Sequence, residues 1–209
     1  YAFWSNRGDE SEMTLTREFD FTQGSGPLTL TYQAWYDLED NYDYLFLVVS
    51  EDGETWQILK TPSSTDEDPS GNSYGWGYNG YSRGWIEESV NLSQFAGKKI
   101  WVRFEYITDM GVNGEGFLLD DVRIPEINYS EDFESSDGGW DGDGFVRIQN
   151  RLPQTFRIAI MRNGRTVSVE TVKLEAGQSA SIPLRMGEDV RDAVLVVSGT
   201  TRFTTQPAY

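Results

Sequence analysis

Hydrophobic and polar residues alternate with a period of two in the first 125 residues of the chain. Residues 28–36 and 100–106 carry apolar side chains at every second position, mostly with polar residues between them. Successive side chains of an extended chain point to opposite faces, so both stretches predict strands with one buried face. Residues 44–49 are apolar throughout, which predicts a central strand buried on both faces.

Turn signals separate these stretches. Asp52-Gly53, a dipeptide typical of hairpins, follows the central strand and precedes a short strand near residues 56–59. Residues 117–124 form the last strand expected in this half. No stretch of it has the 3.6-residue spacing of an amphipathic helix, so the pattern predicts an antiparallel β-sandwich.

The remainder of the chain repeats this pattern on a smaller scale. Apolar residues of 156–160 and 167–169 flank Asn163-Gly164, a strong hairpin signal. Further strands are expected near residues 179–184 and 193–198. Five or six strands in about 65 residues suit a small immunoglobulin-like β-sandwich, whose core is small enough to need support from its neighbour.

Charge divides the chain in the same place. Residues 1–143 contain 29 acidic and 8 basic residues, a net charge of −21, whereas residues 144–209 contain 5 acidic and 9 basic residues, a net charge of +4. Such a change of sign suggests a module boundary. We therefore predict a β-sandwich over residues 1–126, an acidic linker over 127–143 and a second β module over 144–209.

Composition excludes several chemistries. The chain has no His and no Cys, which rules out a Ser-His-Asp triad, a His- or Cys-ligated zinc and a thiolate nucleophile. Its net charge of −17 argues against a nucleic-acid partner and favours hard cations with oxygen ligands. The longest apolar run has six residues, so no membrane span is expected. The chain begins at Tyr1, and we expect it to be a piece of a longer protein.

Two acidic segments carry candidate chemistry. The turn of residues 36–44 contains Asp37, Glu39, Asp40 and Asp43 between two core strands. Paired carboxylates can serve a glycosidase, but the alternate-position spacing that sandwich glycosidases use on one strand is absent. Calcium binding and a solvated acidic hairpin remain as alternatives. In the second segment, Asp120-Asp121 interrupts an apolar strand, so alternation predicts that one carboxylate faces the core and needs hydrogen-bond donors or a metal.

A Gly-rich loop over residues 61–85 carries several aromatic rings. Exposed rings of this kind could stack on the apolar face of a sugar, and a loop that folds back would instead use them to cap the core. The weak candidates for ligand binding are Tyr74, Trp76, Tyr78 and Tyr81.

Several segments in order resemble the C-terminal region of the immune inhibitor A family of secreted bacterial metallopeptidases: "FWSNRGDE", "LTYQAWYDLEDNYDYLFLVVSEDGETW", "WIEESVNLSQFAGKKIWVRFEYITD", "GFLLDDVRIP" and "GWDGDGFVRIQNRLPQTF". The resemblance covers roughly residues 3–160. It implies a MAM-like (concanavalin-type) jelly roll beside a zinc protease domain whose HExxH motif is not in this chain. It also implies structural calcium near the first strand and the Asp-Asp strand, with the candidate ligands Asp9, Glu39, Asp43, Asp120 and Asp121.

These observations favour a non-catalytic, calcium-stabilised accessory module of a secreted, extracellular bacterial metallopeptidase-like protein. Its partners would be the protease domain of the parent chain and an extracellular protein or glycan surface. The alternative is a free-standing carbohydrate-binding or adhesion module on the same fold. A hydrolase in its own right rests on the carboxylates alone.

Overall fold

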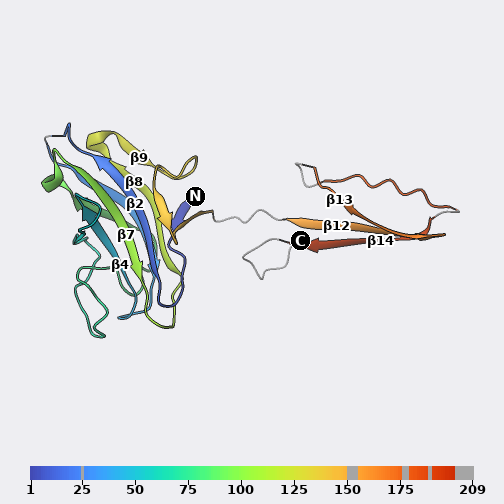
Figure 1. Cartoon of the computed structure of the whole chain (residues 1–209), viewed down its shortest axis with the longest axis horizontal. Coiled ribbons are helices and arrows are strands. Elements are labelled where there is room, and N and C mark those ends of the chain that lie inside the picture. The colour runs from blue at the N-terminus through green and yellow to red at the C-terminus, as the bar shows by residue number, and fades with distance from the viewer. Residues whose placement is uncertain (25, 150–154, 176–178, 188–189, 201–209) are drawn as a thin grey trace. The chain divides into compact units, whose positions relative to one another are not determined.

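The computed structural model describes residues 1–24, 26–149, 155–175, 179–187 and 190–200 (Figure 1). The chain divides into two compact units, Tyr1–Gln149 and Asn150–Tyr209. In both units the described residues form antiparallel sheets, as the alternation predicted.

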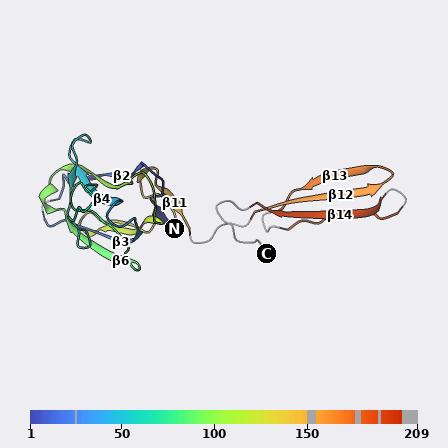
Figure 2. The same ribbon diagram turned by 90° about the horizontal axis from the view of Figure 1, so that it is seen from below.

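Unit 1 is a sandwich of two antiparallel sheets, and Figure 2 shows β2 and β4 in one layer and β3 and β6 in the other. The first sheet has the order β11(Val146–Ile148), β1(Ala2–Trp4), β8(Gly116–Ile124), β3(Thr29–Asp37), β6(Ile86–Asn91), and β9(Tyr129–Glu131) also pairs with β8. The second has the order β10(Asp141–Asp143), β2(Glu12–Asp20), β7(Lys99–Ile107), β4(Tyr44–Ser50), β5(Gln57–Ile58). Two short 3₁₀ helices, η1(Ser93–Phe95) and η2(Pro125–Ile127), lie in the connections.

The core fills the space between the two sheets and follows from the alternation. In β3 and β7 every second side chain is buried, and the side chains between them are only partly covered. Rings supply much of the core volume. The ring of Phe104 packs edge-on against that of Tyr32 at 5.1 Å and lies 5.9 Å from that of Phe117, which are separations typical of favourable aromatic pairs.

β4 is buried on both faces, as its unbroken apolar run predicted. Its inner residues belong to the main core, whereas Tyr44, Phe46 and Val48 form a second cluster on the outer face of the sheet. The loop after β5 lies over this outer face. At Gly77 a Cβ atom would come within 2.8 Å of the Phe46 ring, so the close approach of the loop requires glycine there.

The segment predicted to be a linker is part of unit 1. Phe133 and Trp140 are buried in the main core, and β10 pairs with β2. The predicted boundaries at residues 126 and 143 are therefore wrong, because the division lies between residues 149 and 150. Residues 127–143 have the acidic composition typical of a linker, but the few aromatic rings among them pack into the core of the sandwich.

The described residues of unit 2 form one three-stranded sheet of order β13(Val167–Val172), β12(Phe156–Gly164), β14(Val190–Gly199). The predicted hairpin at Asn163-Gly164 is confirmed, with Asn163 opposite Val167. The predicted small immunoglobulin-like sandwich is not seen in these residues, and 179–184 contains no strand. Ile160 is buried, whereas Val169 and Val194 are exposed, so the sheet has little core of its own.

Within the described residues, no helix combines the length and the hydrophobicity that crossing a membrane requires.

Candidate functional site

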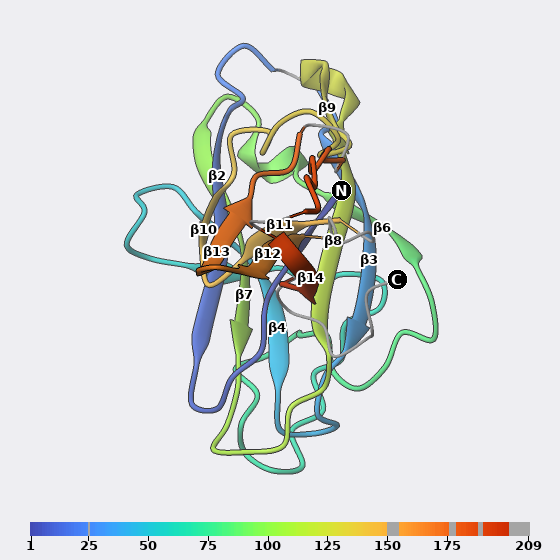
Figure 3. The same cartoon turned by 90° about the vertical axis from the view of Figure 1, so that its right-hand side faces the viewer.

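Three loops meet at one end of the unit 1 sandwich: β1–β2 (residues 5–11), β3–β4 (38–43) and β7–β8 (108–115), which gather at the lower end of the view in Figure 3. Hydrogen bonds hold them together. The Thr108 hydroxyl donates to the Gly8 carbonyl over 2.6 Å and accepts from the Ser11 amide over 2.9 Å. Residues about 100 positions apart in the sequence are thereby fixed next to one another.

An acidic cluster lies among these loops. Glu39, Asp43 and Asp109 each place a carboxylate oxygen within 4.8 Å of the others. Asp43 is only 1% exposed, and its carboxylate accepts hydrogen bonds from the Tyr106 hydroxyl over 3.1 Å and the Asp109 amide over 3.0 Å. The Asn79 side chain donates to the carbonyl oxygens of Glu39 and Asp43, which fixes the backbone of the turn.

The cluster concentrates negative charge. Burial raises the pKa of Asp43, and the charge of Asp109 adds to this, while hydrogen bonds from Asp109 and Tyr106 act against it. Burial, followed by the charges of Asp109 and Asp43, also raises the pKa of Glu39. One Glu39 oxygen, Oε2, is buried and has no hydrogen-bond partner among the described residues. Three carboxylates so arranged repel one another unless a cation lies between them.

A family model described as the immune inhibitor A-like MAM domain matches residues 1–150, which include both sheets and the acidic cluster. The chain belongs to this family. The match ends next to the division between the two units, so the MAM domain corresponds to unit 1.

Three curated relatives share the MAM region in part. Pre-pro-metalloprotease PrtV of Vibrio cholerae is 32% identical over 124 residues, which cover 59% of this chain and 13% of that protein. Immune inhibitor A of Bacillus thuringiensis subsp. alesti is 34% identical over 139 residues, or 64% of this chain and 19% of that protein. Bacillopeptidase F of Bacillus subtilis is 29% identical over 122 residues, or 58% of this chain and 7% of that protein. The chain thus spans less than a fifth of the length of each relative.

The MAM domain brings together some of the predicted metal ligands. Glu39 and Asp43 lie in the cluster, and Asp109, which we did not single out from the sequence, is its third member. Asp109 is the second residue after the end of β7, and a carboxylate close behind a buried strand was the available signal. Asp9 lies at the same end of the sandwich, where it accepts a hydrogen bond from the Asn113 side chain, but it is not one of the three clustered carboxylates.

Asp120 and Asp121 lie elsewhere, on β8, and neither side chain is on the core face. Thr31 pairs with Arg123 and Gln33 with Asp120, so two steps along β3 correspond to three along β8. Asp121 occupies this bulge with a positive φ of 51°, and it forms an ion pair with Arg123. The prediction that one carboxylate points into the core is therefore wrong, because the extra residue breaks the alternation.

The rings of the Gly-rich loop serve different purposes. Tyr78 is fully buried and its hydroxyl is hydrogen-bonded to that of Tyr32, so it is not accessible to a ligand, contrary to our expectation. Trp76 is covered by Lys60, whose amine lies 3.4 Å from the ring centre. Tyr81 is 55% exposed and packs against Trp35, and Tyr74 is 70% exposed.

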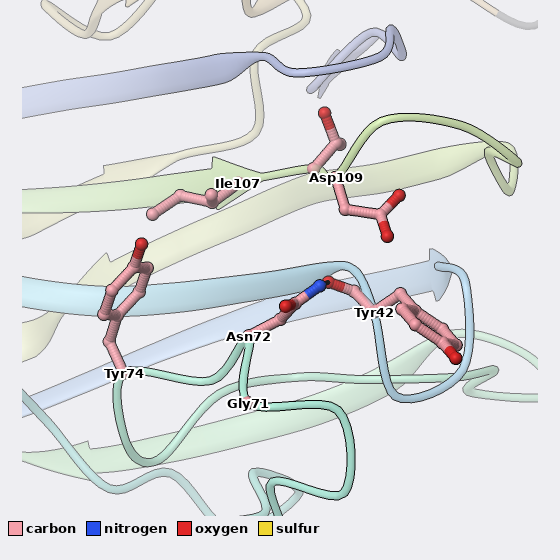
Figure 4. A pocket seen from close by; sticks show the side chains of 7 residues that line it. Tyr42, Gly71, Asn72, Tyr74, Ile107 and Asp109 are labelled. Atoms are coloured by element: carbon pink, nitrogen blue, oxygen red, sulfur yellow. Dashed lines mark hydrogen bonds between the residues drawn. The ribbon is translucent and has the colours of Figure 1, made fainter.

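Tyr74 borders a pocket next to the acidic cluster. We call it the Tyr42–Tyr74 pocket; it is lined by Tyr42, Gly71, Asn72 and Tyr74 from two loops and by residues 107–109 from the end of β7 and the following loop. Figure 4 shows Asn72 between the two tyrosines and the Asp109 carboxylate on the opposite wall. Of the four predicted ligand-binding rings, Tyr74 alone lines this pocket.

Proposed function

We propose that this chain is a non-catalytic accessory module of a larger secreted bacterial peptidase, stabilised by calcium at Glu39, Asp43 and Asp109. Membership of the MAM family supports the accessory role, as does the similarity to a small part of a protein named as a metalloprotease. The module would support the protease domain of the parent chain or hold an extracellular protein or glycan surface.

The residue types in the chain support a module without catalytic activity. Without His or Cys, the common means of activating a nucleophile are missing. Among the clustered carboxylates, Asp43 is almost fully buried, which argues against its acting as the acid or the nucleophile on a glycosidic bond.

The observation that supports calcium most directly is the buried carboxylate of Asp43, which faces two further carboxylates and is not in an ion pair with any described residue. Its hydrogen-bond donors, a tyrosine hydroxyl and a backbone amide, are both neutral. Calcium accepts six to eight oxygen ligands at about 2.3–2.6 Å, and carboxylates, backbone carbonyls and water can supply them. A doubly charged ion would neutralise most of the repulsion.

Thermal unfolding tests the metal. In EDTA the chain should melt several degrees below its melting temperature in calcium, because an ion at about 100 times its dissociation constant adds about 2.7 kcal/mol of stability. Magnesium should raise the melting temperature less than calcium does, since magnesium requires a smaller, near-octahedral site. Identical melting in EDTA and in millimolar calcium, with no calcium found by elemental analysis of the purified chain, would exclude the site.

A second candidate function, carbohydrate binding or adhesion, is supported by the exposed ring of Tyr74 at the Tyr42–Tyr74 pocket. Large exposed rings beside a concave surface are typical of binding sites. This function is compatible with an accessory module, because such a module could hold the parent enzyme on a glycan surface. Binding of the full chain to a glycan array would test it.

A further inference from the structure

The Tyr42–Tyr74 pocket adjoins the acidic cluster, because Asp109 belongs to both. Its volume is about 210 Å³. Pockets for drug-sized ligands hold roughly 300–1,000 Å³, so this one has room for a single ring-sized group. The ligand would therefore be one small unit, or the end of a longer chain.

Two rings form its ends. Tyr74 is 70% exposed and Tyr42 is 46% exposed, so both rings are accessible to a ligand. The Phe46 ring lies 5.9 Å from that of Tyr74 and supports it from the second apolar cluster. A supported, exposed ring offers a flat apolar surface at little entropic cost.

Polar groups lie between and opposite the rings (Figure 4). The Asn72 amide nitrogen donates to the Tyr42 carbonyl over 3.2 Å, which holds this side chain in place within the pocket. The Asp109 carboxylate accepts a hydrogen bond from the Gly111 amide over 3.1 Å, which orients it. An amide can both donate and accept hydrogen bonds, and a carboxylate accepts several, so the pair suits a ligand rich in hydroxyl groups.

Charge restricts the ligand further. Glu39 and Asp43 lie beside Asp109, and the first 143 residues carry a net charge of −21. One divalent cation in the cluster would still leave this region negative, so a carboxylated, sulfated or phosphorylated sugar would be repelled. An ammonium ligand would be attracted, but the two tyrosines lie at opposite ends of the pocket with Asn72 between them and do not form an aromatic cage around one point.

We propose that the Tyr42–Tyr74 pocket binds one uncharged pyranose unit of a glycan. The apolar face of the sugar stacks on Tyr74, and its hydroxyl groups bond to Asn72 and Asp109. This inference rests on the glycan-binding part of the proposed function and deepens it by naming the pocket and the ligand class. The pocket shares Asp109 with the proposed metal site, and a carboxylate has enough lone pairs to serve both.

Nuclear magnetic resonance of the full, ¹⁵N-labelled chain tests the proposal, with the methyl glycosides of glucose, galactose, mannose and N-acetylglucosamine as probes. At least one of them should shift the amide signals of Gly71, Asn72 and Asp109 with a millimolar dissociation constant, and methyl glucuronide should not. Tyr74→Ala should weaken binding about tenfold or more, which corresponds to about 1.4 kcal/mol. Tyr81→Ala is the matched control, because this ring is 55% exposed and lies outside the pocket.

The proposal is overturned if no glycoside shifts these signals, if the shifts lie elsewhere, or if Tyr81→Ala weakens binding as much as Tyr74→Ala. Choline binding without glycoside binding would overturn it in favour of a cation site. The metal proposal fails separately. A calcium-dependent melting temperature without glycoside binding overturns only the pocket, and glycoside binding without a calcium response overturns only the metal site.

Discussion

The hydroxyl groups of Tyr32 and Tyr78 lie 2.6 Å apart inside the core of unit 1. Tyr32 is on β3, and Tyr78 is on the loop between β5 and β6, so the bond joins two segments 46 residues apart. Both rings are almost fully buried. This contact shows that the long Gly-rich loop contributes to the core, in addition to covering the outer face of β4.

Tyr78→Phe should destabilise unit 1 because it leaves the Tyr32 hydroxyl buried without this partner. An unsatisfied buried hydroxyl costs about 1–3 kcal/mol. The double variant Tyr32→Phe/Tyr78→Phe should lose less stability than the two single variants lose together, since it leaves neither hydroxyl unpaired. Urea unfolding of all four proteins measures the coupling, and Tyr81→Phe is a surface control. Additive losses would mean that the two hydroxyls do not depend on each other.

Glu88→Met should stabilise the protein. Glu88 lies on the core face of β6, is fully buried, and has no hydrogen-bond partner for either carboxylate oxygen among the described residues. A buried carboxylate without partners is costly, and an apolar side chain of similar length avoids that cost, so we expect a gain of about 1–3 kcal/mol in the free energy of unfolding. The exposed neighbour Glu87→Met is the control. A marked loss in Glu88→Met would indicate that the carboxylate is satisfied, for example by internal water.

Strand positions could be predicted where one face of a strand is buried, because the apolar residues at every second position are then the ones that face the core. β3, β4, β7 and β8 were found within a residue or so of their bounds on this basis. β2 was missed although Met13, Leu15 and Phe19 face the core, because Arg17 interrupts the pattern. The Arg17 guanidinium lies over the Tyr129 ring, a contact between distant segments that no local pattern reveals.

The candidate site was only partly predictable for a similar reason. Glu39 and Asp43 share one turn and could be paired from the sequence, whereas Asp109 reaches them only through the pairing of β4 with β7. One of Asp120 and Asp121 was expected to face the core because alternation was assumed to continue through a bulge. Tyr78 and Tyr81 lie three residues apart in an irregular loop, and only the folded chain shows which one is buried.

Truncation should distinguish the observed boundary from the predicted one. Residues 1–149 alone should unfold cooperatively, since both sheets and the whole unit 1 core are retained. Residues 1–126 should fail to fold, because Phe133, Trp140 and Phe145 are removed from the core. Loss of one such ring costs about 3–5 kcal/mol, so the loss of all three is comparable to the whole net stability of a typical domain, about 5–15 kcal/mol. Dispersed amide signals from residues 1–126 would contradict this.

The stability of unit 1 should depend on pH through Glu105. Burial, followed by hydrogen bonding with Glu12 and its charge, raises the pKa of Glu105 to about 7 from the usual 4.5. The folded state then binds more protons than the unfolded state in this window, so the contribution of Glu105 becomes less favourable as the pH rises from 4.5 to about 7. Glu105→Gln should therefore stabilise the protein above pH 7 and have little effect below pH 4.5.

We expect a gain of about 1–2 kcal/mol for Glu105→Gln at the higher pH, after allowance for screening of a partly exposed group. Urea unfolding of the wild type and the variant across this range measures it. The conservative control is Glu12→Gln, which removes the neighbouring charge and should give a smaller gain of the same sign. A difference between wild type and Glu105→Gln that is independent of pH would contradict the shift.

Removing a carboxylate from the acidic cluster should change the melting temperature in opposite directions in EDTA and in calcium. In EDTA, Glu39→Gln removes one of three mutually repelling carboxylates and should raise the melting temperature. In calcium, the same change removes a ligand and should lower the melting temperature relative to the wild type, because less binding free energy is linked to folding. Glu39 is preferable to Asp43 for this test, since the Asp43 carboxylate also accepts structural hydrogen bonds from Tyr106 and Asp109.

Asp120→Asn is the matched control, because this carboxylate is partly buried on β8 and lies outside the cluster. Its melting temperature should rise in calcium as much as that of the wild type. If Asp120→Asn loses the calcium response and Glu39→Gln keeps it, the metal lies at the Asp-Asp strand, as the resemblance first implied. If Glu39→Gln changes the melting temperature equally in EDTA and in calcium, its effect is electrostatic only, because loss of a metal ligand must make the change less favourable in calcium than in EDTA.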